Sequence, residues 1–189
     1  MVQFNSEIFR DWERAKEFID PSNRYIQSYP ELLSATQCLV GNFREASIPM
    51  VAHLVYGWMP KILSYNRDIN QDNSIFESVY AENLNDALAV VDSIEYPPTN
   101  NAWVGMSKTL HFLNPKLFPI WDSKVARVLG VSASKMSSRK IYRDYMVFIF
   151  SIIEQPFVER IQAEFVRRVG YEISKVRAAE FVLFVIGED

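Results

Sequence analysis

The sequence predicts an all-α fold. Apolar residues recur at spacings of three and four through most of its 189 residues, which is typical of helices with one buried face. No segment shows the alternation of apolar and polar residues that a half-buried strand requires. The chain is long enough to enclose a core. Its composition, 49% hydrophobic and 23% charged residues, is ordinary for a globular protein. We therefore expect helices packed on helices, in one compact domain over residues 1–189.

Prolines and small polar residues predict the helix boundaries in the first part of the chain. An apolar face over residues 6–18 predicts a first helix, which Pro21 ends. A second helix is expected to begin at Pro30, as a first-turn proline, and to run to Phe43. A third, very apolar helix is predicted over residues 47–57.

A polar loop and a proline-rich break follow. Residues 66–73, NRDINQDN, have the composition of a loop. Ser74 is expected to cap the next helix, with Glu77 completing a capping box, and another helix is predicted over residues 85–94. Two prolines and several polar residues then interrupt the pattern, so that residues 96–101 are a candidate boundary between two lobes.

The stretch WVGMSKTLHFLNPKLFPIWDSKVARVLG, residues 103–130, contains the residues of greatest chemical interest. A Val-Gly pair at Val104 and Gly105 predicts a turn before Lys108. A proline-bounded loop then leads to Asp122, which opens a new helical pattern. Because a carboxylate accepts the first free N–H groups of a helix, a structural interpretation of Asp122 is that it is only an N-cap.

The remainder of the chain is also predicted to be helical. Residues 132–140, SASKMSSRK, form a polar, positively charged loop. Helices with apolar stripes are expected over residues 141–155 and from Pro156 to Gly170, where the glycine ends the second. A last helix, capped by a serine, is predicted over residues 174–185.

Two motifs around Lys108 and Asp122 resemble a known family. The run IWDSKVAR, residues 120–127, fits a pattern like V-D-T-H-V-x-R, and Val104, Gly105, Lys108 and Thr109 fit a glycine-containing hairpin that leads into a lysine-bearing helix. These motifs resemble the helix–hairpin–helix DNA glycosylase superfamily, and the chain looks most like bacterial 8-oxoguanine DNA glycosylase-like proteins. The resemblance implies a two-lobed helical fold, with a cleft between an N-terminal lobe and the hairpin-bearing part.

The resemblance also implies base-excision repair of DNA, with an oxidised purine as one candidate substrate. Lys108 would be the nucleophile at the sugar carbon C1′, with strand cleavage as an accompanying lyase activity. Asp122 would stabilise the positive charge that develops on the sugar. A base removed in this way has to leave the DNA stack and enter a pocket.

Further residues are expected to contact DNA. The hairpin would supply Gly105 and Ser107, whose backbone N–H groups bind phosphate. Basic residues cluster within seventeen positions (140 − 124 + 1) that contain no acidic residue, and these are expected to form a phosphate-binding rim: Lys124, Arg127, Lys135, Arg139 and Lys140. Four aromatic residues are candidates for the base pocket, although the core is the alternative place for each: Trp103, Phe112, Phe118 and Trp121.

The distribution of charge is consistent with DNA binding to the second half. The first hundred residues hold 7 Lys and Arg against 14 Asp and Glu, so the remainder holds 20 − 7 = 13 against 23 − 14 = 9. The net charge of −3 therefore hides a basic C-terminal part, where phosphate would bind. The alternative is an uneven solvated surface.

Several classes of protein are disfavoured. With Cys38 as the one cysteine and His53 and His111 as the two histidines, we expect no metal, no iron–sulfur cluster and no other cofactor. No apolar run is long enough for a membrane span, and the first residues are charged where a signal peptide is apolar. We therefore expect a cytoplasmic, monomeric protein with no membrane partner.

Two other functions stay open. Besides a glycosylase, the chain could be a DNA-binding module of the same fold that lacks catalysis. It could also be an all-α interaction protein that has no nucleic-acid role. The low isoelectric point of about 5.5 is the main support for the last of these.

Overall fold

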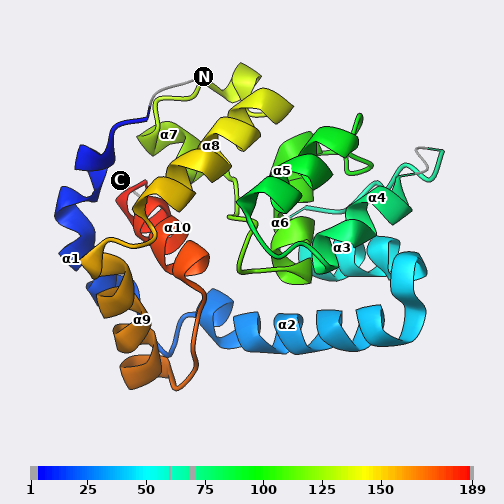
Figure 1. The fold of residues 1–189 in the computed structure, drawn as a ribbon. Helices are drawn as coiled ribbons and strands as arrows, with labels where there is room; N and C mark the ends of the chain where they lie inside the picture. Colours follow the sequence, from blue (N-terminus) through cyan, green and yellow to red (C-terminus); the bar gives the residue numbers. More distant parts are fainter. Residues whose placement is uncertain (1–3, 60, 69–70, 188–189) are drawn as a thin grey trace.

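The computed structural model describes residues 4–59, 61–68 and 71–187, and it confirms the all-α class (Figure 1). No strand occurs in the described part of the chain, where one isolated bridge joins Tyr65 to Thr99. The α-helices are α1 (Trp12–Ala15), α2 (Arg24–Phe43), α3 (Ile48–Gly57), α4 (Asp72–Phe76), α5 (Leu84–Ser93), α6 (Ala102–Leu113), α7 (Ser123–Val128), α8 (Arg139–Ile152), α9 (Pro156–Val169) and α10 (Lys175–Ile186). Short 3₁₀ helices are η1 (Ser6–Asp11), η2 (Lys16–Phe18), η3 (Arg44–Ser47), η4 (Glu77–Val79) and η5 (Ala133–Lys135).

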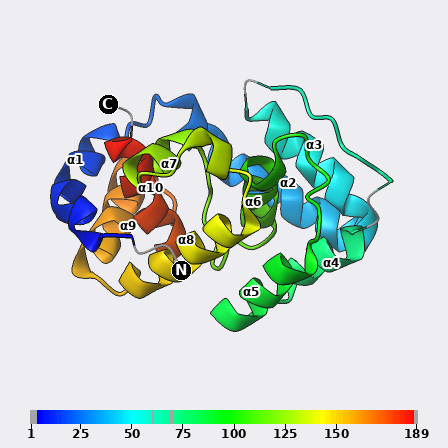
Figure 2. The ribbon, with the colours of Figure 1, turned by 90° about the horizontal axis from the view of Figure 1, so that it is seen from above.

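The helices gather in two groups that lie side by side (Figures 1 and 2). Helices α2 to α6 form one group, in which α3 and α6 pack together and α2 contacts both. Helices α7 to α10 form the other, with α10 in contact with α7, α8 and α9. Contact between α5 and α8 joins the two groups on one side.

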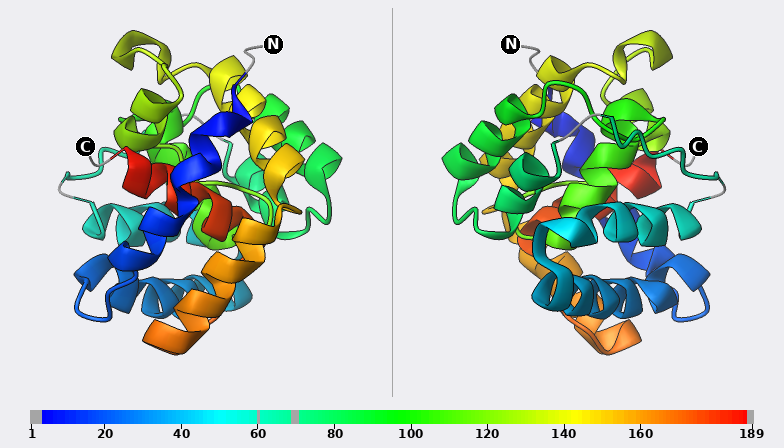
Figure 3. Two further views of the ribbon diagram at one scale, coloured as in Figure 1. Left: turned by 90° about the vertical axis from the view of Figure 1, so that its left-hand side faces the viewer. Right: turned by 90° about the vertical axis from the view of Figure 1, so that its right-hand side faces the viewer.

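The N-terminal segment belongs with the C-terminal helices. Both η1 and α1 pack against α10, and Figure 3 shows this segment lying across α10. The chain thus leaves the second group after α1, builds the first group from α2 to α6, and returns. The segment 96–101 turns from α5 into α6, and the Asn66 N–H donates to the Pro98 carbonyl oxygen at 2.8 Å. Its role as a lobe boundary stays a prediction.

The predicted helix starts were wrong at two places. Pro30 lies inside α2 instead of in its first turn, because Asn23, seven residues earlier, caps the helix by accepting from the N–H groups of Tyr25 and Ile26. Ser74 lies inside α4, which begins at Asp72. The start of α2 is thus explained by a side-chain cap, whereas Gln71, which precedes α4, makes no side-chain cap bond.

Other boundary predictions are confirmed. Gly170 ends α9 in the left-handed conformation, at φ 80°, which costs glycine little. The Ser174 hydroxyl oxygen accepts from the Arg177 N–H at 3.0 Å and so caps α10. Among the helices of the described residues, none combines the length and the apolar character that crossing a membrane would take.

The turn predicted at Val104 and Gly105 is wrong, because both residues lie within α6. Gly105 is buried where α6 meets α3. A methyl group placed on it would come within 2.1 Å of the hydroxyl oxygen of Tyr56 on α3, which is far inside van der Waals contact. The glycine is therefore explained by the close approach of two helices and not by a hairpin.

We predict that Gly105→Ala lowers the free energy of unfolding by about 1–3 kcal/mol, because the added methyl group overpacks this contact. Gly41→Ala is the matched control: Gly41 is also inside a helix, and nothing lies within 4 Å of its added methyl group. The control should be neutral or stabilise by about 0.5–1 kcal/mol. Urea unfolding followed by circular dichroism measures both, and equal effects would contradict the packing argument.

Candidate functional site

A cleft of about 750 Å³ lies between the two groups of helices. One wall comes from the start of α2, the segment after α3 and the first half of α6, and the other from the segment around Asp122 and from α10. The residues that line the cleft include Tyr25, Trp58, Met59, Lys61, Lys108, Ile120, Asp122, Lys124, Met136, Arg177, Glu180, Phe181 and Phe184.

Lys108 enters this cleft from α6. Its Nζ atom lies 3.1 Å from the sulfur of Met59. Burial lowers the pKa of the Lys108 amine, while the carboxylates of Asp122 and Glu180 act in the opposite direction. The amine is therefore easier to deprotonate than a solvated lysine, and a deprotonated amine is a nucleophile.

Asp122 lies on the facing wall and caps α7, as predicted. Its Oδ1 atom accepts from the N–H groups of Lys124 and Val125, both at 3.0 Å. Such a cap is worth about 1 kcal/mol, and it fixes the direction of the carboxylate. Because both cap bonds reach the same oxygen, the cap does not occupy Oδ2.

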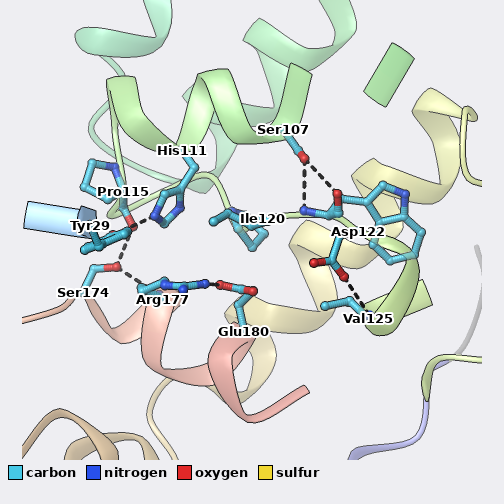
Figure 4. Close-up of polar contacts among 12 residues, drawn as sticks. Tyr29, Ser107, His111, Pro115, Ile120, Asp122, Val125, Ser174, Arg177 and Glu180 are labelled. Carbon is cyan, nitrogen blue, oxygen red and sulfur yellow. Dashed lines mark hydrogen bonds and ion pairs between the residues drawn. The ribbon is translucent and has the colours of Figure 1, made fainter. Parts of the chain in front are cut away.

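A buried, extended segment holds Asp122 in place. Ser107 on α6 is fully buried, and its hydroxyl oxygen accepts from the Trp121 N–H at 3.0 Å. The same hydroxyl lies 3.3 Å from the Trp121 carbonyl oxygen (Figure 4). The residue next to Asp122 is thus bonded to the helix that carries Lys108, and this links the two candidate residues through the backbone.

Three buried side chains bond the carbonyl groups just before Trp121. Tyr142 donates to the Pro119 carbonyl oxygen and Tyr145 to that of Ile120, each at 3.1 Å. His111 Nδ1 bonds the Phe118 carbonyl oxygen at 2.7 Å. A carbonyl oxygen only accepts, so Nδ1 carries the proton, and Nε2 accepts from the Tyr29 hydroxyl at 2.7 Å. Burial and the nearby Arg177 charge lower the pKa of His111 to about 3, so the ring is neutral at pH 7.

Arg177 and Glu180 form an ion pair on α10 (Figure 4), and both residues line the cleft. The Glu180 side chain is fully buried, and its Oε2 atom accepts from Arg177. The guanidinium also lies 5.2 Å from the ring centre of Tyr29. Burial raises the pKa of Glu180 to about 7; the Asp122 charge adds to this, and Arg177 opposes it.

The structure corrects part of the predicted site. Gly105 and Ser107 are buried in α6 and do not form a DNA-binding hairpin. The four aromatic residues suggested for a base pocket belong to the core, with 0–2% of their surface exposed: Trp103, Phe112, Phe118 and Trp121. These four side chains pack the core, and none of them is among the described residues that line the cleft.

The predicted rim residues divide into two kinds. Lys124 lines the cleft, with its Nζ atom 4.2 Å from the ring centre of Phe184, while Arg127 and Lys135 are exposed. The other two have partners within the protein. Arg139 donates to the carbonyl oxygens of Asp92 and Ile94 at the end of α5, and Lys140 pairs with Asp144 at 3.0 Å.

Sequence reasoning missed the pair on α10 and the aromatic residues of the cleft, which are Tyr25, Trp58, Phe181 and Phe184. A signal for Glu180 was present: it is the one charged residue in the apolar run from Ala178 to Ile186. A carboxylate on such a helix is either paired or functional, because burying it alone is costly. No comparable signal identifies the aromatic residues, since they come from segments far apart in the sequence.

Comparison of the chain with protein-family models, with curated proteins and with solved structures gave no match. Within the described residues, no group of three or more His, Cys, Asp or Glu side chains is placed to hold a metal ion.

We predict that Ser107→Ala lowers the free energy of unfolding by about 1–3 kcal/mol, because it leaves the buried Trp121 N–H without its acceptor. Ser151→Ala is the control. Ser151 is exposed, and its hydroxyl donates to the Phe148 carbonyl oxygen within the same helix. Its effect should stay within about 0.5 kcal/mol. Chemical denaturation measures both variants, and a Ser107 effect as small as that of the control would show that the bond does not hold the segment.

Proposed function

We propose that the protein is a DNA glycosylase of the base-excision type, with Lys108 as the nucleophile and Asp122 as the group that stabilises the sugar cation. One observation carries the proposal: an amine with a lowered pKa and a carboxylate fixed by a helix cap line the same cleft from opposite walls. This is the pair of groups that attack at a sugar carbon requires.

In the proposed reaction, the Lys108 nitrogen attacks C1′ of the deoxyribose. The bond between C1′ and the base nitrogen breaks, and the base leaves with that electron pair and takes up a proton. As this bond weakens, positive charge develops on the sugar, and the Asp122 carboxylate stabilises it. The sugar ring then opens: the C1′–O4′ bond breaks, O4′ takes up a proton, and the amine loses its protons, which leaves a Schiff base between Lys108 and C1′. Loss of a proton from C2′ then drives β-elimination, which breaks the bond between C3′ and its oxygen.

The surroundings of Lys108 suit this role. Its side chain is partly buried, and burial is the largest influence on its pKa. An amine in such a place is deprotonated at a lower pH than lysine in water. The carboxylates of Asp122 and Glu180 act in the opposite direction and limit this lowering of the pKa.

The arrangement of helices is consistent with the two-lobed glycosylase fold, because the cleft lies between two groups of helices. Since α6 is continuous from Ala102 to Leu113, DNA contact through a hairpin at Gly105 is not part of the proposal. The exposed cations Arg127 and Lys135, together with Lys124 at the cleft, are assigned the phosphates instead.

We predict that borohydride traps the wild-type protein covalently on an oligonucleotide that carries its lesion. The panel comprises duplex and single strands with 8-oxoguanine, hypoxanthine, uracil or an abasic site. Lys108→Met should abolish the adduct because the nucleophile is absent. Lys116→Met is the control, as Lys116 is exposed in the turn after α6 and is not among the described residues that line the cleft, and it should leave trapping unchanged. Denaturing gel electrophoresis measures the adduct.

The same assay tests Asp122. Asn also caps helices, so Asp122→Asn should unfold at nearly the wild-type denaturant concentration. Base release should fall by about 10²–10³-fold, because the charge facing the sugar is gone. Trapping that survives Lys108→Met would overturn the assignment of the nucleophile. A wild-type protein that binds DNA without releasing any base of the panel would be a binding module, and one that does neither would favour the interaction protein.

We predict that Arg127→Ala together with Lys135→Ala weakens DNA binding to all sequences alike. The slope of log affinity against log salt should decrease by about two units, roughly one for each lost phosphate contact. Lys116→Ala, at an exposed lysine in the turn after α6, is the control for loss of charge and should leave the slope unchanged. Fluorescence anisotropy at several salt concentrations measures it, and an unchanged slope in the double variant would rule out this rim.

A further inference from the structure

One oxygen of the buried Glu180 carboxylate has no hydrogen-bond partner among the described residues. Oε2 accepts from Arg177, but Oε1 is buried and no hydrogen-bond donor of the described residues reaches it. The side chain is 0% exposed. Because a buried acceptor without a donor is destabilising, and more so if it is charged, most such groups in proteins are bonded. The exception at Glu180 needs an explanation.

The position of Glu180 indicates what its free oxygen faces. The residue lines the cleft, and it interacts electrostatically with both Asp122 and Lys108. Figure 4 shows its carboxylate on α10 facing the segment that leads into Asp122. A ligand that brings its sugar to Lys108 and Asp122 therefore brings its base close to Glu180.

The walls around this carboxylate suit a planar, apolar ring. The buried Phe181 and Ile120 line the same cleft, as do the more exposed Trp58 and Tyr25. Aromatic and aliphatic walls with one buried acceptor fit a heterocycle that has a polar edge. The ionised carboxylate only accepts hydrogen bonds, and it predominates at pH 8, above the pKa of Glu180 of about 7. At that pH, where the binding experiments below are made, the matching edge has to offer an N–H group.

We propose that Glu180 reads the base in the cleft: Oε1 accepts a hydrogen bond from a ring N–H on the edge of the base opposite to the sugar. The substrate class is thus a base with such an N–H, as in hypoxanthine, guanine derivatives or uracil, and not adenine or cytosine, whose corresponding ring nitrogen only accepts. This inference rests on the proposed function, since it assumes that a DNA base occupies the cleft.

A purely structural pair would not require this arrangement. Arg177 has five N–H donors and lies three residues before Glu180 on the same helix, yet its bond reaches Oε2 and leaves Oε1 unbonded. Arg177 thus fixes the carboxylate in one orientation without using its second oxygen. A group held in place with a free acceptor is preorganised for a ligand.

The first experiment varies the ligand on the wild-type protein. The probes are 9-methylhypoxanthine and 1-methyluracil, in which a methyl group takes the place of the sugar and one ring N–H remains. Their counterparts, 1,9-dimethylhypoxanthine and 1,3-dimethyluracil, lack that N–H. Saturation-transfer NMR titrations should show that each counterpart binds about tenfold more weakly or worse, because the buried acceptor loses its donor.

The second experiment separates a lost hydrogen bond from a clash with the added methyl group. In Glu180→Gln, Arg177 draws the amide oxygen toward itself, so the amide nitrogen takes the place of Oε1 and an acceptor becomes a donor. The preference for the N–H probes should disappear. Asp144→Asn is the matched control: Asp144 is a buried carboxylate, 7% exposed, paired with Lys140 outside the cleft. It should keep the full preference, and circular dichroism checks that both variants fold.

These outcomes are distinct from those of the trapping assay. Equal binding of the N–H probes and their counterparts by the wild type overturns the role of Glu180, whatever the trapping result. The same holds if no probe binds, or if Glu180→Gln keeps the preference. If the preference is present and depends on Glu180 while no lesion is trapped, Glu180 stands as a base-reading residue and the catalytic proposal falls.

Discussion

The candidate site depends on one contact, the bonds between Ser107 and the backbone of Trp121. They join α6, which carries Lys108, to the extended segment that ends in Asp122. An extended segment inside a helical protein has no neighbouring strand to satisfy its N–H and C=O groups, so side chains have to do so. Buried Ser, His and Tyr residues supply these bonds, and the position of Asp122 follows from them.

This dependence explains which parts of the molecule could be predicted from the sequence. The helical class and the caps at Asp122 and Ser174 follow from local patterns, which short-range physics decides. The turn predicted at Gly105 is wrong for a reason that no local pattern shows. The glycine is explained by its contact with Tyr56, which lies on another helix about fifty positions earlier in the sequence. Pro30 was misjudged because the cap at Asn23 starts α2 sooner.

The candidate site could be predicted only in part, for a related reason. Lys108 and Asp122 are close in sequence, and the two motifs that contain them suggested through their resemblance to a known family that they belong together. Trp58, Arg177 and Glu180 come from opposite parts of the chain, and only packing brings them into one cleft. The aromatic residues near the motif were predicted to line a base pocket, but they lie in the core. Large aromatic side chains are often needed to fill a core, and sequence alone does not distinguish these two roles.

The packing of η1 and α1 against α10 has a consequence for folding. Helices α2 to α6 are contiguous in the chain, so their contacts form over short sequence separations, which favours rapid folding. The other group needs residues from both ends of the described chain. During synthesis, α2 to α6 are therefore able to assemble first, while η1 and α1 wait for α10. The cleft is completed last, so that Lys108 is in place on α6 before its facing wall exists.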